Sequence, residues 1–507
     1  MNCQTSIWSS YRRLALAAGF AFVLSARAGP VTWSKGADTA TYTTNLMSTT
    51  NWNGGFPGNG SNVFMVWNRG SSGSANTITI TNAAADKFFA DSLSITNASS
   101  NKSTVNINIS GQTFLTNGVG SLIFAGASTS NQNITLNFLT NFNFNSATFF
   151  GQSGNATMAF AGGTVVGSNL TFSGNASGVN AFIITAPIVN LSSNFTVSAG
   201  DANNTVVISN STVTVAGRLS VAGNTTDQYF TLTNATMTVS NGVANTGKID
   251  ILNLGSLNVT RDWTNNSVLN IAGGGNVISA TGNTLTNQSN GVITGSGFIK
   301  SALINQGSMS WGGTISNNLT QTAGTNTLTG NATITGNSTV SAGILNLAGN
   351  RLTNGLLVVS GTGLLTNSVA GGTVNGAFSN AATVAVTADT FFNAAVTNTG
   401  TMFFRGAISN NFVTSGSVTL NNAATITGTT SLTAGSLNLA GQRLTNGLLV
   451  VSGTGILTNN TGGATVNGAV SNAATIALTA NTFFNSAVTN TGTLFLLGTV
   501  SNNLVNS

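Results

Sequence analysis

The sequence predicts an all-β protein built as a parallel β-solenoid, a rod of short strands wound into stacked coils. Apolar and polar residues alternate in many short segments, such as Thr77–Thr81 (TITIT) and Val105–Ile109 (VNINI). This period of two places the apolar side chains on one face of a strand and the polar ones on the other. Clusters of Asn, Gly and Ser separate the segments, and these residues tolerate the left-handed backbone that tight corners need. No amphipathic helix is predicted after the first 28 residues.

An internal repeat of 92 residues is the strongest of these observations. RLTNGLLVVSGTG occurs unchanged at Arg351–Gly363 and at Arg443–Gly455, and the flanking segments Thr333–Leu347 and Ser379–Gly400 recur at the same offset with few changes. Units that are apolar on one face bury it by stacking, so a regular repeat predicts a rod. At roughly 20 residues per coil, one unit forms about four or five coils. Thr and Asn at outward or corner positions can form hydrogen-bonded ladders between the coils.

The composition favours an ordered protein without catalytic groups. Apolar residues make up 41% of the chain and charged residues only 4%, whereas disordered segments are usually rich in charge. The chain has no histidine and no glutamate, so the groups most used for acid–base catalysis and metal ligation are missing. These features predict a protein that is not an enzyme and that binds no cofactor or metal.

The first 28 residues have the regions of a secretory signal peptide. Two arginines form a basic start, an apolar run follows, and Ala26–Ala28 matches a cleavage site, so we expect cleavage between Ala28 and Gly29. This segment carries three of the 14 basic residues and the only cysteine, Cys3. The mature chain then has 11 scattered Lys and Arg against eight Asp, a net charge of +3. We therefore expect a secreted or cell-surface protein without disulfide bonds and without a nucleic-acid partner.

The chain divides into six expected segments. They are a signal peptide (1–28), a Trp-rich N-terminal cap (29–74), an irregular solenoid (75–303), repeat unit 1 (304–406), repeat unit 2 (407–498) and the start of a truncated further unit (499–507). In the cap segment, Trp33, Trp52 and Trp67 are expected to close the end of the solenoid, and the alternative is a sugar-stacking site.

Two motifs resemble those of a known bacterial family. The pattern T-I-T-G-x-[ST]-x-x-x-A-G-x-L-N-L occurs at Thr333 and at Thr425. Trp33, Asn51–Gly55 and Val63–Trp67 are similar to the segment that opens the mature chains of the same family. The chain thus resembles autotransporter-associated β-strand repeat proteins. The resemblance implies a right-handed parallel β-helix exported to the cell surface, and membrane contact only through a C-terminal translocator that this sequence lacks.

Three aspartates are weak catalytic candidates. Parallel β-helices also carry polysaccharide lyases and hydrolases, which need clustered carboxylates. Asp201, Asp227 and Asp250 are separated by 26 and 23 residues, about one coil each, so they can stack on one side near Lys248 or Arg261. The expectation that we favour is three unrelated aspartates in turns.

Other charged residues are expected to have structural roles. Arg261–Trp263 is the densest charged group, and we expect a local ion pair there. The recurring Arg351 and Arg443 lie beside turns and are expected to be solvated. A scaffold tolerates the replacement of two unit 1 charges in unit 2, whereas a repeated active site does not. The replacements are Asp389 by Asn481 and Arg405 by Leu497.

Three functions remain open. The favoured one is an exported, non-catalytic structural and adhesive solenoid of the bacterial cell surface or matrix, which binds glycans or surface proteins through faces rich in Thr and Asn. The alternative is a carbohydrate-active β-helix enzyme that uses the three aspartates. The third is an ice-binding-like solenoid, suggested by Thr-x-Thr strands such as Thr77–Thr79 and Thr333–Thr335.

Overall fold

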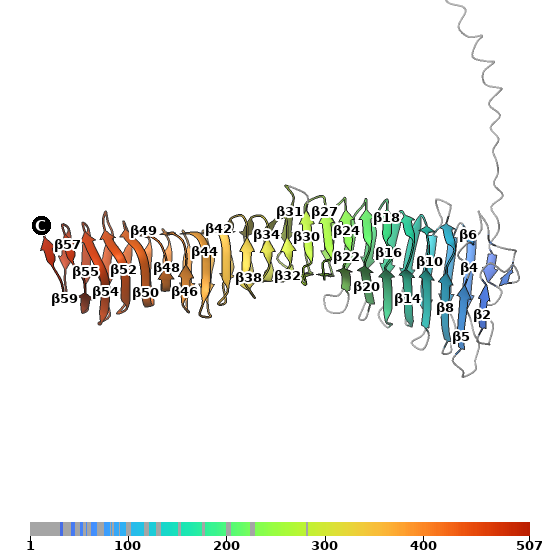
Figure 1. Cartoon of the computed structure of the whole chain (residues 1–507), viewed down its shortest axis with the longest axis horizontal. Coiled ribbons are helices and arrows are strands. Elements are labelled where there is room, and N and C mark those ends of the chain that lie inside the picture. The colour runs from blue at the N-terminus through green and yellow to red at the C-terminus, as the bar shows by residue number, and fades with distance from the viewer. Residues whose placement is uncertain are drawn as a thin grey trace, which may run out of the picture.

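A computed structural model of the chain describes residues 31–33, 42–45, 51–53, 57, 62–67, 76–81, 83, 86–90, 92–97, 103–115, 121–127 and 133–507, the last range without 151–153, 175–177, 199–203, 224–228 and 280–281. This part consists of β-strands and the turns between them, and it contains no α-helix. The strands stack along one axis into a long rod (Figure 1). The prediction of an all-β parallel solenoid is confirmed, whereas its right-handedness stays a prediction.

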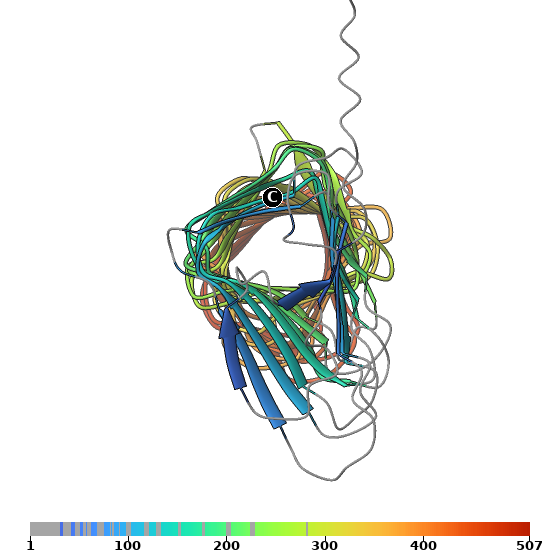
Figure 2. The same ribbon diagram turned by 90° about the vertical axis from the view of Figure 1, so that its right-hand side faces the viewer.

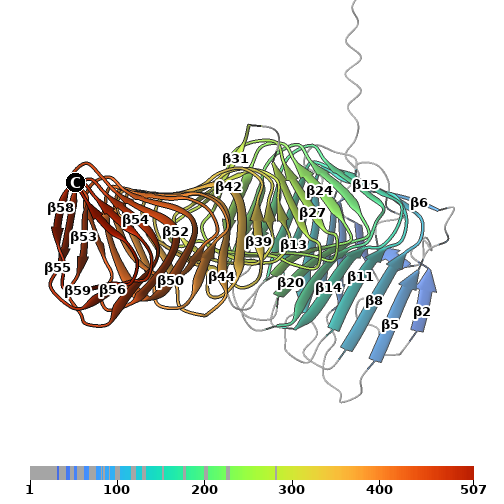
Figure 3. The ribbon, with the colours of Figure 1, turned by 60° about the vertical axis from the view of Figure 1, so that its left-hand side comes forward.

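Three strands form one coil of the rod. In a coil near the middle of the rod they are β20 (Asn204–Ser209), β21 (Thr212–Val215) and β22 (Leu219–Ala222). The next strand, β23 (Tyr229–Thr233), pairs in parallel with β20, so the chain has returned to its starting face one layer further along. The repetition creates three parallel stacks of strands around a common axis (Figure 2, Figure 3). We call them face A, which contains β20, face B, which contains β21, and face C, which contains β22.

The inward side chains of the three faces form one continuous apolar core. In β11 (Asn133–Phe138), Ile134, Leu136 and Phe138 are at most 1% exposed, whereas the residues between them are partly exposed. The alternation seen in the sequence therefore predicts the buried face correctly. In the N-terminal half of the rod, phenylalanine rings of successive coils pack on one another inside this core.

Asparagine ladders run along the corner where face C leads into face A. Asn245, Asn265 and Asn287 lie in register in successive coils and are at most 1% exposed. The amide of Asn245 donates to the side-chain oxygen of Asn265 at 2.6 Å, and Asn265 donates to Asn287 at 2.8 Å. Similar ladders begin at Asn380 and Asn472. The sequence predicts ladders at outward or corner positions, and these lie at a corner but are buried. Each amide also donates to a backbone carbonyl in the turn or at the start of the following face A strand, which satisfies the buried polar group.

In the repeat region, single strands bend around a corner and belong to two faces. β42 (Arg351–Val359) pairs with β39 (Ala332–Ile334) on face B and with β40 (Ser338–Val340) on face C. β52 (Arg443–Val451), which has the same sequence 92 residues later, pairs with two parts of β50 (Ser417–Leu432) on the same two faces. Identical segments thus form the same bent strand at both places.

The register on face A shows how many coils separate two positions that are 92 residues apart. The residues Thr327, Asn346, Thr366, Ala385, Phe403 and Thr419 follow one another in successive layers. Five coils therefore separate Thr327 from Thr419, which corresponds to roughly 24 Å of rod at ~4.8 Å per coil. The proposed unit boundaries stay predictions, and β34 (Ala302–Asn305), β48 (Thr401–Ile408) and β59 (Gly498–Val500) each run through one of them.

The N-terminal end of the rod holds one antiparallel pair of strands. β1 (Val31–Trp33) pairs antiparallel with β3 (Trp52–Asn53) and parallel with β4 (Asn62–Trp67) of face C. The Trp52 side chain is 5% exposed and its ring lies 6.3 Å from that of Phe88 in the core. The side chains of Trp33 and Trp67 lie outside the described residues. The cap function of the three tryptophans stays a prediction.

The C-terminal strands continue the same stacks. β59 (Gly498–Val500) pairs with β56 (Thr482–Phe484) on face B, and β60 (Leu504–Asn506) pairs with β57 (Val488–Asn490) on face C. Residues 499–507, expected as the start of a further unit, thus lie in regular layers. At the other end of the sequence, residues 1–28 and the predicted cleavage site between Ala28 and Gly29 lie outside the described residues.

Candidate functional site

Asp250 is the member of the predicted aspartate cluster that the structure describes. It lies in the middle of β26 (Lys248–Leu252) on face A, and only 6% of it is exposed. Its carboxylate accepts a hydrogen bond from the Asn270 amide at 2.9 Å and lies 3.5 Å from the Lys248 ammonium group. A buried carboxylate needs such partners to be stable, so this arrangement is explained by structure alone.

The register determines which residues lie beside Asp250. Asp250 pairs with Thr231 in one neighbouring coil and with Asn270 in the other, and Thr231 pairs in turn with Val207. The residues directly above and below Asp250 are therefore not acidic. Asp201 and Asp227 lie outside the described residues, so the cluster of three stays a prediction. Among the residues that the structure describes, no group of three His, Cys, Asp or Glu side chains is arranged to hold a metal ion.

The ion pair expected within Arg261–Trp263 does not form. In the described part of the chain, the ion pairs join Lys248 to Asp250 and Arg405 to Asp389, so the expected pair between Arg261 and Asp262 is wrong. Asp262 instead accepts a hydrogen bond from the Thr284 backbone N–H of the next coil, at 2.7 Å. The carboxylate therefore points along the rod toward the next coil.

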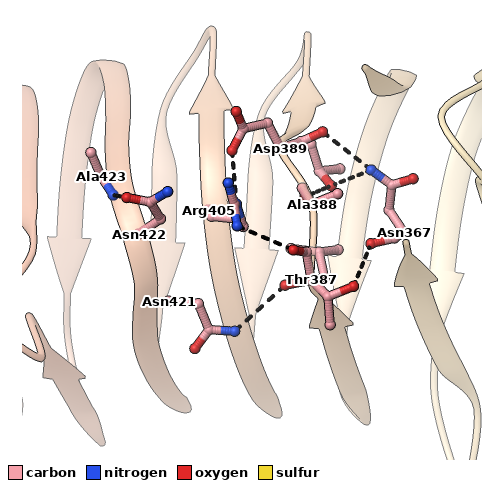
Figure 4. A network of polar contacts seen from close by, with 10 residues as sticks. Asn367, Thr387, Ala388, Asp389, Arg405, Asn421, Asn422 and Ala423 are labelled. Carbon is pink, nitrogen blue, oxygen red and sulfur yellow. Dashed lines mark hydrogen bonds and ion pairs between the residues drawn. The ribbon is translucent and has the colours of Figure 1, made fainter. Parts of the chain in front are cut away.

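A polar network surrounds the charged pair of repeat unit 1 at a corner between faces A and B (Figure 4). The Arg405 Nε donates to Asp389 Oδ1 at 2.8 Å, and its Nη1 donates to the Thr387 carbonyl at 3.2 Å. Asn367 lies in the preceding coil and donates to the Asp389 carbonyl at 3.1 Å. The equivalent Asn459 donates to the Asn481 carbonyl at 3.3 Å, so this backbone contact does not depend on the charge.

The combined change Asp389→Asn and Arg405→Leu is expected to lower the free energy of unfolding by less than about 1 kcal/mol. The reason is that 48% of the Asp389 side chain and 27% of the Arg405 side chain are exposed, and water screens such a pair. Repeat unit 2 already carries the two substituted residues. Urea unfolding followed by circular dichroism measures the difference. A loss of several kcal/mol contradicts this expectation.

Two other sets of predicted residues are the recurring arginines and the Thr-x-Thr segments. Arg351 and Arg443 each begin a long strand and are exposed, in agreement with a solvated position beside a turn. The Thr-x-Thr segments behind the ice-binding hypothesis lie on different faces, because β5 (Asn76–Thr81) is on face A and β39 is on face B. These two segments therefore do not belong to one flat array.

Face C carries an uninterrupted outward row of uncharged side chains. Most of its members are Thr or Ser, the rest are apolar, and all are partly or fully exposed. In register order along the rod, the row is Phe64, Ser94, Ile123, Thr148, Thr171, Thr196, Ser220, Ala244, Thr264, Thr286, Ile304, Thr320, Thr339, Val358, Ser379, Thr397, Val413, Ser431, Val450, Ser471, Thr489 and Val505. At ~4.8 Å per coil, it extends over a length on the order of 100 Å.

A shallow hollow of about 210 Å³ lies at the corner between faces B and C. Arg218, Gly242 and Asp262 occupy equivalent positions in three successive coils and line it, each just before a face C strand. Our reading of the sequence missed this site. The signal that could have found it is a change of residue type at one corner position, which earlier coils fill with asparagine, Asn169 at the start of one face C strand and Asn194 just before the next.

Compared with known proteins, the chain matches no family model, and neither a curated protein nor a solved structure is detectably similar to it. The described coils define a β-solenoid protein, and membership of the family named above stays a prediction. No helix in the described part of the chain is long and apolar enough to cross a membrane.

Proposed function

We propose that this chain is an exported, non-catalytic β-solenoid that acts as a structural and adhesive rod on the bacterial cell surface or in the surrounding matrix. The outward row of face C is the observation that carries this proposal. A parallel stack holds its Thr and Ser hydroxyls at a regular spacing of ~4.8 Å, and a hydroxyl group can both donate and accept. A long glycan or protein partner that lies along the row then gains many weak contacts at once.

The rigidity of the rod supports this role. A partner that must find many hydroxyls loses less conformational freedom on binding when those hydroxyls are fixed beforehand. The buried asparagine ladders and the continuous core hold the coils in register. The signal peptide motif and the near absence of acid–base residues in the sequence favour export and a non-catalytic role.

Removal of hydroxyls from face C tests the adhesive row. The change of Thr148, Thr171 and Thr196 to Val keeps the side-chain shape and removes three neighbouring hydroxyls. We expect binding of the mature chain to insoluble cellulose, chitin or pectin to weaken by at least about tenfold, since each of the three lost hydrogen bonds contributes about 0.5–1.5 kcal/mol. Cosedimentation measures the bound fraction, and assays for reducing and unsaturated sugars are expected to detect no product.

A matched control lies on face B. Thr212, Thr214 and Thr236 project outward from two stacked strands, and their change to Val is expected to leave cosedimentation as it was. Equal losses of binding in both triple variants would show that binding does not depend on face C in particular. Release of sugar products that depends on Asp227 or Asp250 would instead favour the carbohydrate-active enzyme.

A further inference from the structure

At four places along the corner between faces B and C, an asparagine side chain bonds the backbone of the next coil. Asn169 Oδ1 accepts the Asn194 N–H at 3.3 Å, and Asn194 Oδ1 accepts the Arg218 N–H at 2.9 Å. Further along the rod, Asn318 and Asn411 accept equivalent N–H groups, each at 2.9 Å. The acceptor oxygen of one coil thus satisfies an N–H group of the coil above it.

This pattern is interrupted at two successive coils. The Arg218 guanidinium has no acceptor, because all its nitrogen groups are donors, and Gly242 has no side chain. Among the described residues, the N–H groups of Gly242 and Asp262 consequently have no hydrogen-bond acceptor. Asp262 restores the pattern by accepting the Thr284 N–H at 2.7 Å. The hollow therefore lies where two acceptor oxygens are missing.

Charged groups of opposite sign stand on either side of the missing acceptors. Arg218 is exposed, and its guanidinium makes no ion pair or hydrogen bond with the part of the chain that the structure describes. Asp262 is exposed on the other side of Gly242, and its second carboxylate oxygen is left for a ligand. Thr264 and Thr286 of the face C row also line the hollow, together with Asn241, Val243 and Trp263.

We propose that this hollow binds the carboxylate of an acidic sugar unit. The carboxylate oxygens replace the missing asparagine oxygens and accept from the Gly242 and Asp262 N–H groups, while Arg218 forms a charge-assisted pair with them. Hydroxyl groups of the same sugar donate to the second oxygen of Asp262 and exchange hydrogen bonds with Thr264 and Thr286. The nearby Asp262 carboxylate repels a phosphate group, which carries close to two negative charges, more strongly than a carboxylate, and this favours a singly charged ligand.

The volume of the hollow limits the ligand. At about 210 Å³ it is smaller than the sites of about 300–1,000 Å³ that hold drug-sized molecules, so it accommodates one sugar unit. The site adjoins the row of face C at Thr264 and Thr286, so the acidic unit of a longer glycan docks there while its neighbours lie on the hydroxyls of the row. This inference rests on the proposed adhesive function and assigns one specific subsite to it.

Calorimetric titration of the mature chain with a short oligogalacturonate tests the subsite. We expect binding that is at least tenfold tighter than that of the matching neutral galacto-oligosaccharide and of its phosphorylated form. Arg218→Gln removes the charge and is expected to weaken oligogalacturonate binding about tenfold to a hundredfold, whereas Arg443→Gln, at an exposed arginine elsewhere, does not change it.

The variant Gly242→Asn tests whether binding can be lost while the protein still folds. The backbone at Gly242 has a φ of +82°, which asparagine tolerates, and an added Cβ meets no atom closer than 3.6 Å. The new side chain fills the hollow and supplies one of the two missing acceptors, so we expect binding to be lost while the melting temperature falls no further than in the control variant, which has a similar backbone strain. The control is Gly463→Asn, at a φ of +93° with nothing within 4 Å, which is expected to bind normally.

The outcomes distinguish this subsite from the adhesive function as a whole. Unchanged oligogalacturonate affinity in Gly242→Asn, or equal affinity for the neutral sugar, overturns the acidic subsite. In that case, binding to insoluble polysaccharide that still depends on the three face C threonines leaves the adhesive rod intact. Loss of both kinds of binding in the unmodified chain overturns both proposals.

Discussion

Replacement of Asn287 by alanine is expected to destabilise the middle of the rod by about 3–5 kcal/mol. The side chain is fully buried and takes part in four hydrogen bonds. It accepts from Asn265 at 2.8 Å and donates to Asn305 Oδ1 at 2.8 Å, to the Ser308 carbonyl at 3.1 Å and to the Gly291 carbonyl at 3.2 Å. Alanine leaves these partners buried and unpaired, and each such group costs about 1–3 kcal/mol.

Hydrogen exchange is the measurement that localises this effect, because a solenoid opens in local units and not all at once. The amides of β28 (Trp263–Asn265), β31 (Thr284–Asn287) and β34 are expected to exchange about two to three orders of magnitude faster. The exposed Asn290, in the adjacent turn, provides the control, and Asn290→Ala is expected to change exchange very little. Similar rates in both variants would show that the ladder contributes little.

Replacement of Phe160 by alanine is expected to cost about 3–5 kcal/mol in the N-terminal half of the rod. The side chain is fully buried at the centre of the aromatic stack. Its ring centroid lies 5.3 Å from that of Phe142, 5.5 Å from Phe138, 5.6 Å from Phe182 and 6.2 Å from Phe144. Alanine leaves a cavity between these rings, and a close-packed core relaxes only in part to fill it.

The exposed Phe150 provides the matched control for this core position. It is 43% exposed at the end of β13 (Ser146–Phe150), so Phe150→Ala is expected to cost less than about 1 kcal/mol. Urea unfolding and limited proteolysis with mass mapping of the cut sites measure both variants. Early cleavage near residue 160 in the first variant alone is the expected result, and equal stability of the two variants contradicts it.

Local patterns allowed much of the fold to be predicted. Alternation in segments such as Asn133–Phe138 gave the strands and their buried faces, since the direction of a side chain in a strand is a local property. The absence of charge from most strands was also a sign of stacking, because like charges repel in neighbouring coils. The corner asparagines were expected in ladders, yet their burial could not be predicted, because it depends on which residue lies in register in the next coil.

The candidate sites were much harder to predict than the strands. The sequence spacing of Asp201, Asp227 and Asp250 is close to one coil, but the coil length in this rod varies. Register partners on face A are 16 residues apart at Thr294 and Ser310 and 29 residues apart at Val105 and Ile134. Spacing alone therefore does not place two side chains together, and the acidic group of Asp250 lies beside Thr231 and Asn270.

The sequence by itself determined that this chain forms a stacked all-β rod, because period-two alternation and a long repeat require strands that bury one face against their neighbours. The tertiary structure alone decided which side chains meet. The row of hydroxyls on face C and the hollow between Arg218 and Asp262 both arise from turns of unequal length that bring distant residues into register. Register is a property of the whole stack, so no local pattern contains it.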